Sequence, residues 1–441
     1  MNPLFDRWTN TSVLAFSSED DPVTTVIQKS RALVLRAIDK GWAGPPFDPL
    51  KLATLLEIRV SANGAVREAR LIRGEDGEAQ IEYNPTRPRG RLRYSIAHEI
   101  AHTLFPDWAD QIRHRGPDAR ADSDEWQLET LCNIAASEIL MPLSDCSELG
   151  HPDADIHVLL EEQKRFDVST EALLVRAVRV REDPCAVFCA SKKGNSEDSP
   201  YSIDYTIGSR AWTGGVRRGM ALPKGSAVAG CTGIGFTAKA DEDWGETVGE
   251  CHVEAVGIPP YPGSSYPRVV GLLRPTEGKA SKNIETIQYV RGDATHPQGV
   301  GARVIVHIVN DQAQVWGGHG FAASLRKTHK GLQQSFRDWV IASRDHLSLG
   351  RTHFAETSEG LVVASMVAQH GFGPSDTPRI RYEALQICLN DVLRHAQGRS
   401  VSVHMPRIGT GNAGGKWNII KEVVENTLIE GGVSVTVYDP V

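Results

Sequence analysis

The hydrophobic pattern of this chain changes twice, and the two changes constrain its fold more than any other feature. Residues 22–181 combine amphipathic helical stretches with a few short strands, whereas residues 182–275 consist of strand-like runs separated by Gly and Pro. From residue 284 onward, strand and helix patterns alternate, which is typical of a three-layer α/β/α domain. The sequence therefore predicts a flexible N-terminus at 1–21, an α+β domain at 22–181, a β-rich middle domain at 182–275, a polar linker at 276–283 and an α/β/α domain at 284–441.

The composition is that of a globular protein. Hydrophobic residues make up 40% of the 441 residues and charged residues 23%, which excludes a wholly disordered chain. No apolar run approaches the roughly 20 residues of a membrane span, and the opening residues do not resemble a secretory signal. The net charge of −7 argues against direct nucleic-acid binding. Seven cysteines, an odd number without paired spacing, favour reduced thiols and a cytoplasmic location.

An H-E-x-x-H pattern, formed by His98, Glu99 and His102, lies within a predicted apolar helix. Residues four apart share one helix face, so both imidazoles can reach a single metal ion, and zinc readily accepts imidazole nitrogen. Glu99 stands beside them, where a carboxylate can take a proton from water. The pattern predicts a catalytic zinc site, and its alternative is a chance match of five residues.

A catalytic zinc needs a third protein ligand, which we expect from the next strong helix, predicted at residues 124–141. Glu129 lies on the core-facing stripe of that helix, where an unpaired carboxylate would be costly. Glu125, one turn earlier, is the alternative. Asp122 and Asp124 have a simpler explanation as residues that cap the N-terminus of the helix.

Two segments around these residues, RLRYSIAHEIAHTLF and LETLCNIAASEILMP, resemble the ImmA/IrrE family of metallopeptidases. The resemblance covers about residues 22–180. It implies a zincin-like fold with one Zn²⁺ on His98, His102 and Glu129, and with Glu99 as general base. Members of this family typically cut a helix-turn-helix repressor during stress or mobile-element induction, which implies a protein substrate and a role in stress or phage defence. Cys132 and Ala135 stand where many members have Ala and Phe, and we interpret both as packing changes.

Four cysteines lie in the β-rich middle. Their spacing lacks the short pairs of a zinc site, so we interpret them as small buried hydrophobic residues. Aromatic and basic residues between Tyr201 and Arg218 could form a ligand face, but an ordinary sheet surface is the simpler interpretation.

Two glycine-rich loops follow predicted strands in the C-terminal part of the chain. One contains Gly317, Gly318 and Gly320, and the other extends from Gly409 to Gly415. Glycine lets the backbone approach an anion, and the helix after each loop offers free N–H groups, so the two loops could enclose a diphosphate. Ordinary tight turns are the alternative. A dinucleotide-binding interpretation of the G-x-G-x-x-G in the second loop is weaker, because the remaining strand–helix units of that fold would have to follow it.

The stretch from about Ile284 to Val441 resembles a macro domain, since YVRGDAT, HIVND, GGHGFA, RIRYEAL and HMPRIGTGNAGGKW occur in the order of that family. It is most similar to the branch that includes terminal ADP-ribose protein glycohydrolase. The resemblance implies binding of ADP-ribose or of an ADP-ribosylated protein. It assigns Asp293 to the adenine amino group, Asn310, Gly317, Gly318 and Gly320 to the distal ribose and its phosphate, and Gly409, Thr410, Gly411 and Asn412 to the diphosphate.

The sequence departs from that glycohydrolase at two catalytic positions. Ala413 stands in place of an aspartate, and the run SMVAQHG lacks the expected lysine. We therefore expect ADP-ribose binding, which would control the peptidase. The alternatives are an ADP-ribosyl hydrolase that uses Asn310, Asp311 or His319, and a non-enzymatic ADP-ribose sensor.

Overall fold

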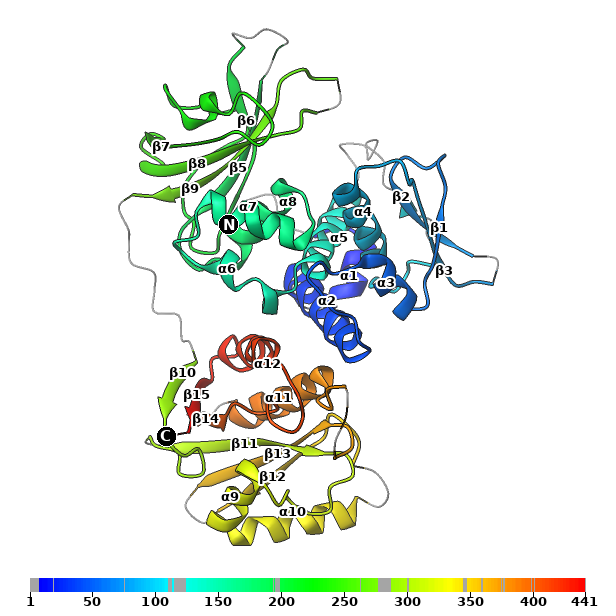
Figure 1. Ribbon diagram of the computed structural model, residues 1–441, viewed down its shortest axis with the longest axis vertical. Coiled ribbons are helices and arrows are strands. Elements are labelled where there is room, and N and C mark those ends of the chain that lie inside the picture. Colours follow the sequence, from blue (N-terminus) through cyan, green and yellow to red (C-terminus); the bar gives the residue numbers. More distant parts are fainter. Residues whose placement is uncertain are drawn as a thin grey trace. The chain divides into compact units, whose positions relative to one another are not determined.

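The computed structural model describes residues 8–440, except for residues 19, 75, 110–112, 115–123, 193, 195–198, 262, 277–286, 300, 344–346, 358–359, 374, 376, 398 and 400 (Figure 1). The chain divides into two compact units, Met1–Val34 with Trp42–Lys282, and Leu35–Gly41 with Asn283–Val441. The predicted boundary at residue 181 falls inside the first unit, so it stays a prediction. The predicted linker lies almost wholly outside the described residues.

The first part of unit 1 is an α+β assembly. A four-stranded sheet has the order β1-β3-β2-β4, in which β1 and β3 are parallel and the other pairs antiparallel. The elements are α1 (Thr11–Ser17), α2 (Pro22–Asp39), α3 (Pro49–Leu55), β1 (Arg59–Ala62), β2 (Ala69–Arg73), β3 (Ala79–Tyr83), α4 (Arg89–His102), β4 (Arg113–His114), α5 (Glu125–Leu140), α6 (Ser147–Gly150), α7 (Ile156–Phe166) and α8 (Thr170–Val180).

Part of the N-terminus that was expected to be flexible is helical instead. The side chain of Asn10 accepts a hydrogen bond from the Val13 amide at the start of α1, which satisfies one of the free N–H groups of the first turn. Phe16 stacks on Phe105 with ring centroids 4.3 Å apart, and Val13 is fully buried in the same core. The apolar face of this short helix is hidden in the sequence by the polar residues on either side.

A buried ion cluster ties three helices of this unit together. Glu138 on α5 forms an ion pair with Arg176 on α8, and its Oε2 lies 3.4 Å from Nε of Arg31 on α2. Burial alone would raise the pKa of Glu138, but the two guanidinium charges outweigh burial and hold this pKa below its usual value. The cluster therefore carries its charge in the interior and fixes the helix that supplies Glu129.

The β-rich middle is one antiparallel sheet, as the sequence predicts. Its strands are β5 (Ala186–Lys192), β6 (Tyr201–Gly208), β7 (Thr237–Asp243), β8 (Glu250–Ile258) and β9 (Arg268–Pro275), in the order β6-β5-β9-β8-β7. The sheet is joined to α8 by a bidentate ion pair between Arg268 and Glu171, with distances of 3.0 and 2.9 Å. All its cysteines are free and buried, and burial raises the pKa of each thiol, to about 11 for Cys185, Cys231 and Cys251 and about 12 for Cys189.

Unit 2 is built on a six-stranded mixed sheet with the order β10-β15-β14-β11-β13-β12. All neighbouring pairs are parallel except β12 with β13. The elements are β10 (Gln288–Arg291), β11 (Ala302–Asn310), α9 (Gly320–Thr328), α10 (Lys330–Ala342), β12 (Thr352–Glu356), β13 (Leu361–Gln369), α11 (Tyr382–Ala396), β14 (Val401–Pro406), α12 (Trp417–Val424), a π-helical turn (Glu425–Ile429) and β15 (Ser434–Asp439).

Alternate residues of the central strand β11 enter two different cores. Val304 and Val306 pack with residues of α11 and α12, whereas Ile305 packs with residues of α9 and α10. Helices therefore cover both faces of the sheet, and the predicted three-layer α/β/α architecture is confirmed (Figure 1). Within unit 2, the edge strands β10 and β12 are the elements that the sequence pattern does not reveal. No helix in the described part of the chain is both long and apolar enough to cross a bilayer.

Candidate metal centre and glycine loops

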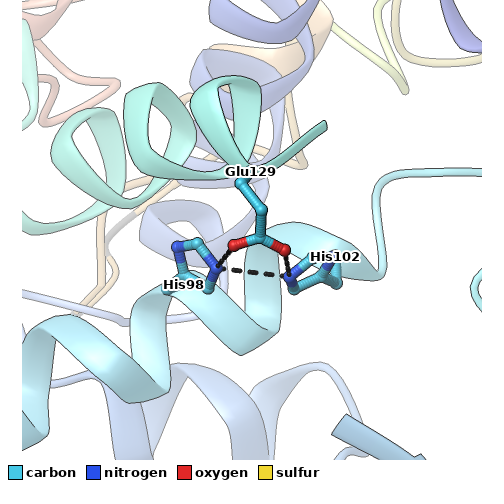
Figure 2. Close-up of side chains that lie close together, drawn as sticks. All are labelled: His98, His102 and Glu129. Atoms are coloured by element: carbon cyan, nitrogen blue, oxygen red, sulfur yellow. Dashed lines mark hydrogen bonds and ion pairs between the residues drawn. The ribbon is translucent and has the colours of Figure 1, made fainter. Parts of the chain in front are cut away.

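Two packed helices bring the predicted metal ligands together. His98 and His102 lie four residues apart in the buried second half of α4, so both rings leave the helix on the same side. Glu129 extends from α5 and points between them (Figure 2). Nε2 of His98 lies 3.0 Å from Oε2 of Glu129 and 3.2 Å from Nε2 of His102, which in turn lies 3.5 Å from Oε1 of Glu129. Among the described residues, these three form the one group of His, Cys, Asp and Glu side chains close enough to share a metal ion.

Asn133 determines which nitrogen of His98 carries the proton. Its Oδ1 lies 3.1 Å from Nδ1 of His98 and accepts a hydrogen bond of 2.9 Å from the Tyr94 hydroxyl. Because an amide oxygen only accepts hydrogen bonds, Nδ1 must be the donor, and Nε2 then presents a lone pair. No motif in the sequence points to Asn133, although this residue lies one helical turn after Glu129 on the same face of α5.

Cys132 contacts the second histidine. Its Sγ lies 3.4 Å from Nδ1 of His102, and both side chains are buried. The interpretation of Cys132 as a packing residue is therefore incomplete, because the thiol meets the ring nitrogen that faces away from Glu129. A neighbour at this position helps to fix the orientation of a ligating imidazole.

The chemistry of these side chains fits a zinc ion. Two imidazole nitrogens and a carboxylate face one another at 3.0–3.5 Å, and at least one of these nitrogens presents a lone pair. Two histidines and one carboxylate are a common ligand set of catalytic zinc, which keeps a further position open. His98 is fully buried and the side chain of Glu129 is 32% exposed, so the cluster opens toward solvent on the carboxylate side.

The other carboxylates near the cluster are placed differently. Glu99 is fully buried, and its Oε2 accepts a 2.9 Å hydrogen bond from the Leu71 amide of β2. Glu125, the alternative third ligand, is exposed at the start of α5 and is not part of the cluster. Asp124 lies at the N-cap position but does not cap with its side chain, which instead accepts hydrogen bonds from Thr9 and Asn10. Asp122 lies outside the described residues.

In unit 2, the parallel strands place the predicted ADP-ribose residues along one edge of the sheet. Asp293 follows β10, Asn310 ends β11, and the loop from Gly409 follows β14, so all of them lie at the carboxyl ends of parallel strands. Ligands of open α/β sheets bind at this edge. The strand order does not match that of a dinucleotide-binding fold.

The glycines of the two loops differ in whether there is space for a side chain at their position. A Cβ atom would meet nothing within 4 Å at Gly318, Gly320 or Gly411, whereas at Gly409 it would lie 2.5 Å from Cδ1 of Ile380. Gly409 and Gly320 also have positive φ angles of 73° and 58°. Gly409 is therefore required by the fold itself, while the space around Gly318 and Gly411 is open to a ligand.

The remaining predicted residues lie in these loops or, for Asp293, after β10. Gly317 and Asn412 are exposed, and Thr410 donates a hydrogen bond of 2.8 Å to the Arg407 carbonyl. Both oxygens of Asp293 accept hydrogen bonds from Thr295. Partial burial acts to raise the pKa of Asp293, but these bonds outweigh it and hold the pKa below its usual value. Asp293 is therefore an ionised acceptor at this edge.

The cluster of His98, His102 and Glu129 lies in a segment that matches a known protein family. Residues 56–178 match the peptidase family described as the IrrE N-terminal-like domain. This match contains both histidines and Glu129, and it confirms for these residues the resemblance seen in the sequence. The radiation response metalloprotease IrrE of Deinococcus deserti is 29% identical over 136 residues, which cover 30% of this chain and 48% of that protein.

Two further proteins are similar to parts of this chain. The chromodomain-helicase-DNA-binding protein 1-like of Mus musculus is 29% identical over 161 residues, which cover 35% of this chain and 18% of that protein. The chain thus spans less than half of the length of either curated relative. A solved structure of a macrodomain protein from Streptomyces coelicolor is 36% identical, with a TM-score of 0.31, and covers 35% of this chain and 98% of that one. Residues 56–178 thus match the IrrE N-terminal-like domain, and another part of the chain is similar to a macrodomain protein.

Proposed function

We propose that this chain is a zinc-dependent endopeptidase that also carries an ADP-ribose-binding macro domain. One observation supports the proposed peptidase activity. The Nε2 atoms of His98 and His102 converge on the carboxylate of Glu129. These three side chains would hold the zinc ion. When bound, zinc supplies a Lewis acid for a peptide carbonyl and for water.

Glu99 is the base of the proposed reaction. Glu99 directly follows His98 on α4. The hydrogen bond from the Leu71 amide fixes the orientation of its carboxylate. The carboxylate takes the proton of the attacking water and returns it to the leaving amine as the peptide C–N bond breaks. Burial of Glu99 shields this proton transfer from bulk solvent.

The proposed substrate is a repressor of the helix-turn-helix type, as the family resemblance implies, and the proposed setting is stress or phage defence in the cytoplasm. The test is co-expression of the full chain with candidate helix-turn-helix repressors, followed by electrophoresis of each repressor. Wild type and Glu125→Gln should cleave one of them, whereas Glu99→Gln should bind zinc and cleave none. Cleavage by Glu99→Gln at the wild-type rate would exclude Glu99 as the base.

The metal assignment is tested separately by elemental analysis of purified full-length protein. We expect about one zinc per chain, as three protein ligands imply, and a loss of zinc in Glu129→Ala but not in Glu125→Ala. Full zinc occupancy in Glu129→Ala would refute the assignment of Glu129.

For unit 2, we propose that ADP-ribose binds along the carboxyl edge of the sheet, with Asp293 at the adenine and the two glycine loops around the ribose and the diphosphate. The open space at Gly318 and Gly411 supports this proposal, because a phosphate can approach the backbone there. Calorimetry of the full chain with ADP-ribose tests it, and Asp293→Ala should weaken binding by about 1.5–3 kcal/mol, the value of a hydrogen bond to a charged group. Absence of heat at millimolar ADP-ribose would refute it.

We further propose that ADP-ribose controls cleavage. Such control requires that the nucleotide binds the active and inactive forms with different affinity, and a typical coupling of about 1–3 kcal/mol changes activity by roughly 5–150-fold. The experiment measures repressor cleavage across an ADP-ribose titration in wild type and in Gly411→Glu. An unchanged rate in wild type would show that the two sites act independently.

A further inference from the structure

A histidine–aspartate pair lies at the carboxyl edge of the unit 2 sheet, outside the residues that we propose to bind ADP-ribose. Nδ1 of His370 lies 2.6 Å from Oδ2 of Asp311, although the two residues are 59 positions apart. Asp311 directly follows Asn310 at the end of β11, and His370 directly follows β13, the parallel neighbour of β11. The pair therefore lies beside the residue that we place near the distal ribose of ADP-ribose.

The second glycine loop is connected to this pair through a single residue. The His370 amide donates a 2.8 Å hydrogen bond to the Arg379 carbonyl, and the Arg379 amide donates one of 2.8 Å to the carbonyl of Ala413 in the loop. The Arg379 side chain also holds the turn after β13, since its Nε lies 3.0 Å from the Gly373 carbonyl and its Nη1 3.2 Å from the His370 carbonyl. The backbone of His370 is thus tied, through Arg379, to the loop that we place around the diphosphate.

The two members of the pair differ in exposure. The Asp311 side chain is 16% exposed and that of His370 is 56% exposed. Oδ1 of Asp311 accepts a 2.8 Å hydrogen bond from the Gly371 amide, so both carboxylate oxygens are engaged and the group is an acceptor toward Nδ1. The proton of a neutral imidazole then lies on Nδ1, and Nε2 presents its lone pair. Nε2 has no hydrogen-bond partner within the described residues.

Another pair in the chain shows that this arrangement is not a general property of surface histidines. Nδ1 of His252 lies 2.7 Å from Asp241, but its Nε2 lies 3.3 Å from Glu254, and the Asp241 side chain is 73% exposed. Both ring nitrogens of His252 are occupied and its carboxylate is solvated. The His370 pair, by contrast, leaves one nitrogen available, and the neighbouring Phe372 exposes 68% of its surface beside it.

We propose that His370 is a catalytic base that hydrolyses the glycosidic bond between ADP-ribose and an acceptor side chain, with Asp311 as its positioning residue. This proposal rests on the proposed binding of ADP-ribose by unit 2. Nε2 of His370 takes a proton from a water molecule whose oxygen attacks the anomeric carbon of the distal ribose. The bond from that carbon to the acceptor breaks, and the acceptor leaves with the proton that the imidazolium returns. The products are free ADP-ribose and the unmodified side chain. The pair would thus replace the aspartate and lysine that are missing at Ala413 and in the SMVAQHG run.

The test uses the full chain and three synthetic peptides that carry ADP-ribose on glutamate, serine or arginine. Free ADP-ribose is measured by mass spectrometry, and the affinity of each variant for ADP-ribose is measured by calorimetry. We expect wild type to release ADP-ribose from at least one peptide, and His370→Ala to lower kcat by about 10²-fold or more, the usual worth of a general base, without changing affinity. Added imidazole should restore part of the activity of His370→Ala, because the site is exposed.

Asp311→Asn keeps the shape of the pair and reverses its polarity. The amide oxygen can still accept from Gly371, but the amide nitrogen donates to Nδ1, so the imidazole proton moves to Nε2 and the base is lost. We expect kcat to fall while KM and the ADP-ribose affinity stay as in wild type, a result that a merely structural role would not produce. His252→Ala is the matched control and should retain wild-type release.

The outcomes separate the two proposals. A wild type that binds ADP-ribose but releases none from any peptide, or a His370→Ala variant with the wild-type kcat, would overturn the catalytic role and leave binding intact. A wild type that does not bind ADP-ribose would overturn the binding function and, with it, this proposal.

Discussion

Oδ1 of Asn133 lies 3.1 Å from Nδ1 of His98, the ring nitrogen that faces away from Glu129. The same oxygen accepts the Tyr94 hydroxyl at 2.9 Å, so the amide is held from two sides. This contact fixes the orientation of the ring and leaves a lone pair on the nitrogen that meets the carboxylate. One helix, α5, thus supplies both a proposed ligand and the group that orients another ligand.

Replacement of Asn133 should therefore weaken zinc binding without removing a ligand. For Asn133→Ala we expect zinc affinity to fall by about 10–100-fold, the usual effect of losing a group that orients a ligating histidine. Competition with a fluorescent chelator measures this affinity. Asn133→Asp is the matched control, since its carboxylate still accepts from Nδ1 and should preserve tight binding. Equal affinity in Asn133→Ala and wild type would contradict the positioning role.

Removal of one member of the buried ion cluster should destabilise the protein more than replacement of both members by apolar residues. Arg176→Met removes the main partner of Glu138 and leaves a buried carboxylate poorly compensated, so the free energy of unfolding should fall by about 3–5 kcal/mol. Urea denaturation of the full chain measures the change. The exposed ion pair of Lys164 with Glu161 is the control, and Lys164→Met should cost less than about 1 kcal/mol. If the double variant Arg176→Met, Glu138→Leu recovered no stability, the buried charge would not be the cause.

The two loop glycines should respond differently to substitution. Gly409→Ala places a Cβ 2.5 Å from Ile380 at a positive φ, so we expect a loss of roughly 1–3 kcal/mol of stability. Gly411→Glu has open space and should unfold at the wild-type temperature, but its charge should repel the diphosphate and weaken ADP-ribose binding roughly tenfold or more, about 1.4 kcal/mol. Calorimetry and thermal unfolding test both. Wild-type affinity in Gly411→Glu would show that the diphosphate does not bind this loop.

Buried histidines should make unit 2 sensitive to acid. Desolvation, with a smaller contribution from His353, lowers the pKa of His307 from 6.5 to about 3, and burial lowers that of His404 to about 4. The unfolded chain then binds more protons than the folded chain below pH 6.5, so this contribution to stability is complete above that pH and is lost as the pH falls. At pH 5 the loss is about 2 kcal/mol for each histidine.

Urea unfolding at pH 7 and pH 5 measures that loss. His307→Met fills the same buried position without a titrating group, so its acid-induced loss of stability should be about 2 kcal/mol smaller than that of wild type. His151→Gln, at an exposed position, should behave as wild type. An identical pH dependence in His307→Met and wild type would exclude His307 as a source of acid sensitivity.

Much of this architecture is determined by local sequence. The pattern of hydrophobic residues predicts α4, α5, α7, α8 and most elements of unit 2, because apolar residues at helical spacing, or in runs of helix or strand length, are visible in the local sequence. The four-residue spacing of His98 and His102 likewise fixes their shared helix face before any tertiary contact forms. The short edge strands β10 and β12 escaped prediction, because a few extended residues carry no period that distinguishes them from a loop.

Only the tertiary structure decides which distant groups meet. The sequence left Glu125 and Glu129 as alternative ligands, and the packing of α5 on α4 brings Glu129 to the histidines and leaves Glu125 exposed. The same packing brings Asn133 and Cys132 into contact with the two histidine rings, and the pairing of β11 with β13 brings Asp311 to His370. The physical reason is the same in each case. Helical and strand periods fix the direction of a side chain within its own element, but the group that it meets depends on how two elements pack, and that depends on the whole core.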